Sequence, residues 1–326
     1  MSSNTSAPTP LPTHPSWLRL IFVGPNGLRA GWRFVVFLLI FAAAVVIPAL
    51  VLGHFVPRIP AWAKSQPRGM FTPGYLIFYE SWQTVFLFLA VFVMSKIEKR
   101  AFSDYGLPKG GAFGRKFWLG SAVGLGGVLL QIALIAALGG YSPGPLALAG
   151  GRALQFAFVW AIAFLLAAVN EEFTFRGYLQ KTLASGIGFW PTALVLSMVF
   201  GALHLGNPGE RWPGIVMLFC FGMLAAFTLR VTGDLWFIVG LHAAWDWGHV
   251  FLFSVPIAGM RGTQQLLHSS LRGPRWLTGG SAGPDGSVFA FVVLLCITGL
   301  VNRVFSSGKR FDIATTGADA CRNSAR

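Results

Sequence analysis

Long apolar runs separated by short polar segments dominate this chain of 326 residues. A helix crosses the hydrocarbon core of a bilayer with about 20 apolar residues, and eight runs approach or exceed that length. They cover residues 34–55, 75–95, 117–138, 153–183, 190–204, 213–229, 235–253 and 288–305. Basic residues, Pro and Gly separate the runs, as is typical at the ends of membrane helices. The pattern predicts an all-α, polytopic membrane protein with about eight transmembrane helices.

The composition agrees with this fold class. Hydrophobic residues make up 54% of the chain and charged residues 11%, which is too little charge to solvate a globular protein of this length. The net charge of +14 can indicate a nucleic-acid partner, but the basic residues flank the apolar runs instead of forming one patch. We therefore expect membrane lipid, and no nucleic acid, as a partner. The cysteines Cys220, Cys296 and Cys321 are far apart and indicate neither a disulfide framework nor a thiolate zinc site.

The runs divide the chain into five segments. We expect a flexible cytoplasmic N-terminal tail (1–30), N-terminal transmembrane helices (31–149), a functional core (150–255), an extracytoplasmic loop (256–286), and a last transmembrane helix with a cytoplasmic tail (287–326). Eight crossings place both termini on one side, where most of the 25 Lys and Arg residues lie. The positive-inside rule therefore predicts cytoplasmic N- and C-termini, in the plasma (inner) membrane.

The fourth apolar run contains an acidic motif. Glu171 and Glu172 are adjacent, and Arg176 follows four residues after Glu172. A charge inside a bilayer costs several kcal/mol unless something compensates it. Glu172 and Arg176 share one helix face and can form an ion pair, whereas Glu171 is rotated by about 100° and can face another group.

The fifth and seventh runs carry further polar pairs. Phe200 and His204 are four residues apart, so the phenyl ring can pack beside the imidazole. His242 and Asp246 have the same spacing, and His249 extends their stripe by another turn. Each pair alone is explained as a structural contact. Together they supply the parts of a hydrolytic site, which activates water either directly or through a bound metal.

The order of these motifs resembles that of one protein family, the CAAX prenyl endopeptidase and bacteriocin-processing family of intramembrane proteases (type II CAAX proteases, or the abortive-infection family). The resemblance covers about residues 150–255. It implies an endopeptidase that acts on peptides or membrane proteins, either prenylated or unmodified. The motifs are Glu171-Glu172-x-x-x-Arg176, Phe200-x-x-x-His204 and His242-x-x-x-Asp246.

The resemblance also implies roles for the first two motifs. Glu171 would be the general base that activates the hydrolytic water, and His204 would help to hold that water. Glu172 and Arg176 would brace the site as an ion pair.

The third motif and the cofactor leave alternatives open. By resemblance, His242 would stabilise the oxyanion together with the residue four positions on, which is Asn in many relatives and Asp246 here. An ionised Asp cannot donate a hydrogen bond, so Asp246 is protonated, orients His242, or binds a metal. Glu171, His204 and His242 match the donor types of an open zinc site, whereas a metal-free glutamate mechanism is the other view of the family. The cofactor is therefore either none or Zn.

Two other functions stay in consideration. A non-catalytic family member, acting as a membrane immunity or scaffolding factor, would use the same polar cluster only to lock helices together. A proton-coupled transporter would use it as a proton relay, but residues 30–140 contain no matching polar motif.

Other polar and small residues are assigned structural roles. Glu80 stands alone in the second run and is expected at the headgroup level or paired with a basic neighbour. Gly120 and Gly124 have the spacing of a close helix contact. The predicted helix ends place Glu171 about 18 Å, His204 about 21 Å and His242 about 10 Å from the same membrane face, and these depths agree only loosely.

Overall fold

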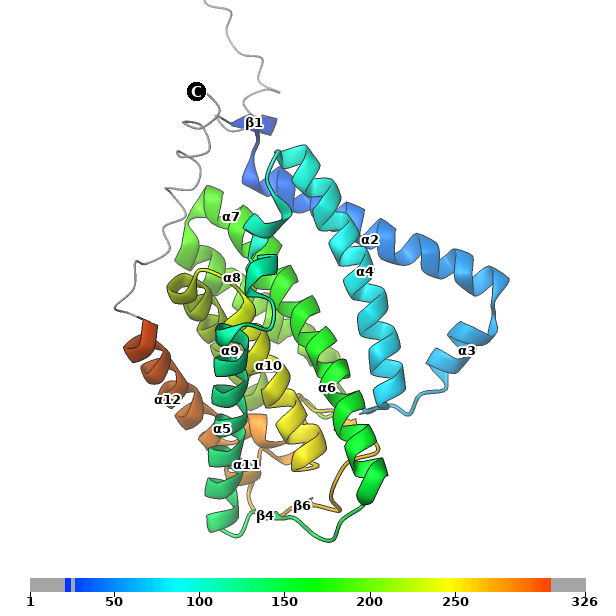
Figure 1. Ribbon diagram of the computed structural model, residues 1–326, viewed down its shortest axis with the longest axis vertical. Coiled ribbons are helices and arrows are strands. Elements are labelled where there is room, and N and C mark those ends of the chain that lie inside the picture. Colours follow the sequence, from blue (N-terminus) through cyan, green and yellow to red (C-terminus); the bar gives the residue numbers. More distant parts are fainter. Residues whose placement is uncertain (1–20, 25–26, 306–326) are drawn as a thin grey trace, which may run out of the picture.

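The computed structural model describes residues 21–24 and 27–305 (Figure 1). Most of the predicted N-terminal tail, and the chain after residue 305, lie outside the described residues. The regular structure of the described chain is helical apart from six strands of two residues each. The all-α, polytopic membrane class predicted from the sequence is confirmed.

Long helices form the body of the molecule. They are α2 (Ala30–Phe55), α4 (Pro73–Glu98), α5 (Arg115–Ala137), α6 (Gly150–Glu172), α7 (Gln180–Ile187), α8 (Phe189–Leu203), α9 (Trp212–Thr232), α10 (Trp236–Trp247) and α12 (Val288–Phe305). Short helices in the connections are α3 (Arg58–Lys64) and α11 (Arg275–Thr278), and π-helical turns form η3 (Phe173–Leu179) and η5 (Gly248–Leu252). The 3-10 turns are η1 (Phe102–Tyr105), η2 (Lys109–Gly111), η4 (His204–Gly206), η6 (Gly280–Ala282) and η7 (Pro284–Gly286). The strands are β1 (Val23–Gly24), β2 (Gly27–Leu28), β3 (Met70–Phe71), β4 (Tyr141–Ser142), β5 (Arg261–Gly262) and β6 (Ser270–Leu271).

Seven helical stretches of the described chain are long and apolar enough to cross a membrane. The predicted run 235–253 is the exception, because α10 has 12 residues and so rises about 18 Å before the π-helical η5 continues it. Helix α10 packs against α5, α6 and α9 inside the bundle (Figure 1). Since protein surrounds this helix, it does not need a full bilayer-length apolar run.

Four connections meet on one face of the molecule, which we call the loop face. Strand β3 pairs with β5, and β4 pairs with β6 near the lower edge of Figure 1. The backbone N–H of Gly209 donates to the carbonyl of Gly259 (3.1 Å). The loop face therefore combines residues 56–72, 139–149, 205–211 and 254–287.

The other helix ends meet on the opposite face. Arg33 at the start of α2 pairs with Glu98 at the end of α4 (Nη1–Oε2 2.9 Å). Lys116 at the start of α5 pairs with Asp234 just after α9. The ring of Phe305, at the end of α12, packs against the first turn of α10. Within the described residues, the chain thus passes between the two faces eight times, once through the short α10.

A helical hairpin sets the depth of the acidic motif. α6, η3 and α7 form one stretch, Gly150–Ile187, and Gly188 reverses the chain with φ +87°, a conformation that disfavours a Cβ. Glu171 precedes Gly188 by 17 residues and His204 follows it by 16. This register brings Glu171 and His204 to matching depths. The predicted depths disagreed because the predicted fourth helix ended too early.

Glycines on α5 allow α10 to approach closely. A Cβ added at Gly120 would lie 1.9 Å from the carbonyl oxygen of Phe237, and one at Gly124 would lie 2.3 Å from that of Leu241. Both oxygens belong to the backbone of α10, so neither can move aside unless the helix moves. The predicted helix contact is confirmed, and it fixes the helix that carries His242.

We expect Gly124→Leu to separate α5 from α10 and to destabilise the protein by at least the roughly 1–3 kcal/mol typical of overpacking. Thermal unfolding and size-exclusion chromatography in detergent measure the effect. Gly126→Leu is the matched control on the same helix, because a Cβ at Gly126 meets nothing within 4 Å. Equal stability of the two variants would contradict the proposed importance of this contact.

Candidate active site

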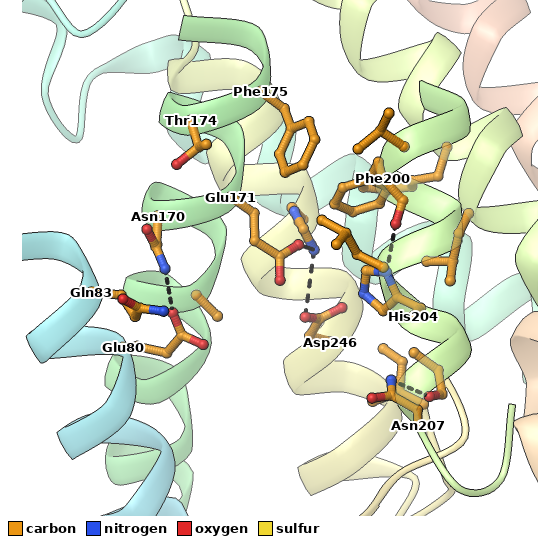
Figure 2. A pocket seen from close by; sticks show the side chains of 18 of the residues that line it. Glu80, Gln83, Asn170, Glu171, Thr174, Phe175, Phe200, His204, Asn207 and Asp246 are labelled. Carbon is orange, nitrogen blue, oxygen red and sulfur yellow. Dashed lines mark hydrogen bonds and ion pairs between the residues drawn. The ribbon is translucent and has the colours of Figure 1, made fainter. Parts of the chain in front are cut away.

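A cavity of about 890 Å³ lies between α2, α4, α6, α8, α9 and α10, with residues of the 254–287 connection in its wall. Apolar side chains form most of its lining. Glu171 on α6, His204 at the end of α8, and His242 and Asp246 on α10 also line it. Figure 2 shows Glu171, His204 and Asp246 around the cavity. The structure thus brings four of the six sequence-predicted site residues to one cavity.

The two adjacent glutamates have different surroundings. The Glu172 side chain is 0% exposed, and its Oε2 lies 3.3 Å from Nη1 of Arg176 one turn later. The Glu171 side chain is 30% exposed and faces the cavity. A helix turns by about 100° per residue, so neighbouring side chains cannot share one environment. The π-helical η3 begins at Phe173, directly after this pair, and such turns recur at functional sites.

His242 connects the buried carboxylate to the cavity. Its Nδ1–H donates to Oε1 of Glu172 (2.9 Å), and the ring of Phe221 packs against it at 4.9 Å between centroids. Its Nε2 lies 3.8 Å from Oε2 of Glu171 and 3.6 Å from Oδ2 of Asp246. Nδ1 of His242 is therefore bonded to the buried Glu172, whereas Nε2 faces Glu171 and Asp246, which line the cavity.

His204 approaches the cavity from the end of α8. Its Nδ1–H donates to the carbonyl of Phe200 (2.8 Å), whose ring also packs beside the imidazole at 5.0 Å between centroids. In the neutral ring this tautomer leaves Nε2 as a hydrogen-bond acceptor. Figure 2 shows His204 across the cavity from Glu171, beside Asp246. The predicted packing of Phe200 against His204 is confirmed.

His249 does not join this group. It is fully buried and is not among the residues that line the cavity. Its ring nitrogens lie 2.9 Å from the carbonyl oxygen of Trp245 and 3.0 Å from Oε1 of Gln131 on α5. The π-helical η5, which begins at Gly248, carries His249 toward α5. The predicted polar stripe therefore ends at Asp246.

The site residues do not fit a resident zinc ion. The described part of the chain contains no group of three or more His, Cys, Asp or Glu side chains placed to hold a metal. In the zinc set considered from the sequence, Nδ1 of His242 is bonded to Glu172, so only its Nε2 would be available to a metal.

Glu80 is a cavity residue that sequence reasoning placed elsewhere. It is 6% exposed, and its Oε2 accepts a hydrogen bond from Nδ2 of Asn170 (2.9 Å), the residue just before Glu171. The packing of α4 against α6 turns Glu80 inward. Glu80 therefore points into the helix bundle and bonds to the amide of Asn170. It lies neither at the headgroup level nor beside a basic residue, the two positions expected from the sequence.

The long connection to α12 supplies another carboxylate. Asp285 lines the cavity and accepts hydrogen bonds from the Trp245 indole (3.3 Å) and from the backbone N–H of Ala258 (3.2 Å). Burial raises the pKa of Asp285 to about 6, against the lowering effect of these two hydrogen bonds. The sequence offered no role for this connection, which the structure places in the cavity wall.

A comparison with known protein families finds a match in the segment that contains the predicted site residues. The family model described as "Rce1-like: Type II CAAX prenyl endopeptidase Rce1-like" matches residues 153–248, which include all six predicted site residues. No curated protein and no solved structure matched the chain. The matched segment begins in α6 and ends where η5 begins, so it contains every helix that supplies these residues. Residues 153–248 are therefore similar to the type II CAAX prenyl endopeptidases, a family of peptidases.

Proposed function

We propose that this protein is an intramembrane endopeptidase in which Glu171 activates the hydrolytic water. The convergence of Glu171, His204, His242 and Asp246 on one cavity carries this proposal. The apolar remainder of the cavity wall limits bulk water, which strengthens the interaction of fixed polar groups with charge that develops during the reaction.

Glu171 and His204 would hold the water between them. As the water oxygen attacks the peptide carbonyl carbon, the Glu171 carboxylate takes one proton, and Nε2 of His204 accepts a hydrogen bond from the other. Glu171 then passes its proton to the amide nitrogen as the C–N bond breaks, which leaves a carboxyl and an amine product. The exposure of Glu171 and the tautomer of His204 support this assignment.

His242 would stabilise the oxyanion. In the doubly protonated ring, Nδ1–H is bound to Glu172 and Nε2–H faces the cavity. Asp246 lies 3.6 Å from Nε2 and, as a carboxylate, cannot itself donate to an oxyanion. Of the three roles left open by the sequence, its position supports orientation of His242. Arg176 would act indirectly, by balancing the charge of Glu172.

We also propose that both termini face the cytoplasm, so that the loop face is extracytoplasmic. The bias of basic residues and the eight passes of the described chain support this orientation. Cysteines introduced at Ser142 on the loop face and at Ser103 on the opposite face, in a background without native cysteines, test it. A membrane-impermeant maleimide applied to intact cells is expected to label the first position and not the second. The reverse pattern would overturn the orientation.

We expect Glu171→Gln to lower kcat/KM for peptide cleavage by about 10²–10⁴-fold, the range of general-base catalysis, without loss of folded protein. Cleavage of prenylated and unprenylated peptides by the protein in detergent measures the change. Glu172→Gln is the matched substitution one residue along. It leaves the buried charge of Arg176 uncompensated, so it is expected to lower the melting temperature as well as activity.

Full activity of a folded Glu171→Gln variant would remove the proposed chemistry and favour a non-catalytic role. Loss of folding in Glu171→Gln, with Glu172→Gln stable, would exchange the roles assigned to the two glutamates.

We expect chelation to leave cleavage within about twofold of the untreated rate, because the described residues contain no group suited to a metal. Dialysis against EDTA or 1,10-phenanthroline, followed by the cleavage assay and elemental analysis of the purified protein, checks this. Loss of activity that added zinc restores would require a metal-bound water instead.

A further inference from the structure

The cavity has an acidic lining inside a strongly basic protein. Four carboxylates line it together with two imidazoles, and among the described lining residues there is no Lys or Arg. The carboxylates belong to Glu80, Glu171, Asp246 and Asp285. The chain as a whole carries a net charge of +14, so the lining is opposite in sign to the protein around it. A low-dielectric wall concentrates the field of such a lining on whatever enters the cavity.

Glu80 and Asp285 are the two lining carboxylates to which the proposed catalysis gives no role, and Asp285 already accepts two hydrogen bonds from the protein. Glu80 belongs to α4, outside the segment that matches the peptidase family. One of its oxygens, Oε2, accepts a hydrogen bond from Asn170, and no Lys or Arg among the described residues forms an ion pair with it. Gln83 lies three residues along the same helix and lines the same cavity, and its Oε1 is buried without a hydrogen-bond partner. This side of the cavity therefore presents acceptors in excess of donors, which a charged donor would satisfy.

We propose that Glu80 is a specificity-determining residue that binds a positively charged side chain, Lys or Arg, close to the scissile bond of the substrate. This inference rests on the proposed function, since it names the substrate class of the same cavity. The substrate cation would supply positive charge close to Glu80. An acidic side chain at the same position would lie near Glu80 without a Lys or Arg in the described lining to offset the two negative charges, so the lining also disfavours acidic substrates.

The arrangement of the site allows one peptide to make both contacts. Figure 2 shows Glu80 and Asn170 on one side of Glu171, and Asp246 and His204 on the other. A peptide whose carbonyl lies next to the water between Glu171 and His204 can therefore direct a neighbouring side chain toward Glu80. The cavity of about 890 Å³ has room for several residues of such a peptide.

Cleavage of a peptide series tests the proposal. The peptides are identical except at one position, which holds Lys, norleucine or Glu, and that position is moved along both sides of the scissile bond. At one position we expect the wild type to cleave the Lys peptide with a kcat/KM at least tenfold above that of the norleucine peptide, with the Glu peptide lowest. Glu80→Gln is expected to reduce the Lys-to-norleucine ratio below threefold, and Glu80→Asp to retain most of it.

Asp104→Asn is the matched control, because it removes one negative charge from an exposed position outside the cavity. It is expected to keep the wild-type ratio. Because the readout is a ratio between peptides, partial loss of folded protein cancels. A wild type without a Lys preference, or a preference that survives Glu80→Gln, would overturn the role of Glu80.

A binding assay separates this inference from the proposed chemistry. Fluorescence anisotropy with the labelled peptides is measured on His204→Ala, which keeps all four carboxylates, and on His204→Ala combined with Glu80→Gln. Tighter binding of the Lys peptide that depends on Glu80, with no cleavage by the wild type, would retain the subsite and remove the protease assignment. Cleavage by the wild type with no such preference in either assay would retain the protease and remove the subsite. If the protein shows no binding preference for the Lys peptide and no cleavage, both the subsite and the protease assignment are removed.

Discussion

The structure depends on compensating one carboxylate that has no access to water. Glu172 is 0% exposed and is approached by Arg176 within its own helix and by His242 from α10. Arg176 lies over the ring of Phe200 on α8 (4.6 Å), and a Cβ at Gly222 on α9 would come within 2.9 Å of its guanidinium. Removing one partner of a buried ion pair typically costs about 3–5 kcal/mol, because the other charge is left uncompensated. Four helices are thus held in one arrangement by a single buried charge.

The functional geometry follows from that arrangement. With Glu172 turned inward, the rotation of the helix leaves Glu171 facing the cavity, and the hydrogen bond from His242 to Glu172 directs the other ring nitrogen toward Glu171 and Asp246. The Glu172–Arg176 pair and the shared face of His242 and Asp246 could be predicted from the sequence, because each pair combines residues four apart on one helix. The hydrogen bond between His242 and Glu172 joins residues 70 positions apart and was not predicted. The spacing of Gly120 and Gly124 predicted a close helix contact, although it did not identify α10 as the partner.

Contacts between distant segments could not be predicted in this way. Nothing in the local pattern around Glu80 states that α4 turns it toward Asn170, 90 positions later. Asp285 reaches the cavity because Trp245 and Ala258 hold its carboxylate, and those residues come from another helix and another part of the connection. The length of α10 was overestimated for a related reason. An apolar run that protein encloses has the same composition as one that lipid encloses, although only the second must match the bilayer thickness.

The separation of charge in this protein explains how a basic chain can contain an acidic cavity. Lys and Arg residues lie mainly in the segments between apolar runs, where anionic headgroups and water stabilise them. There they are screened within about 8 Å at physiological ionic strength, whereas groups enclosed by apolar walls are screened much less. The charges at the faces therefore set the orientation of the chain in the membrane but do not neutralise the cavity. A molecule that enters the cavity interacts mainly with the carboxylates that line it. Basic residues at the faces can therefore set the membrane topology while acidic residues in the cavity select the substrate.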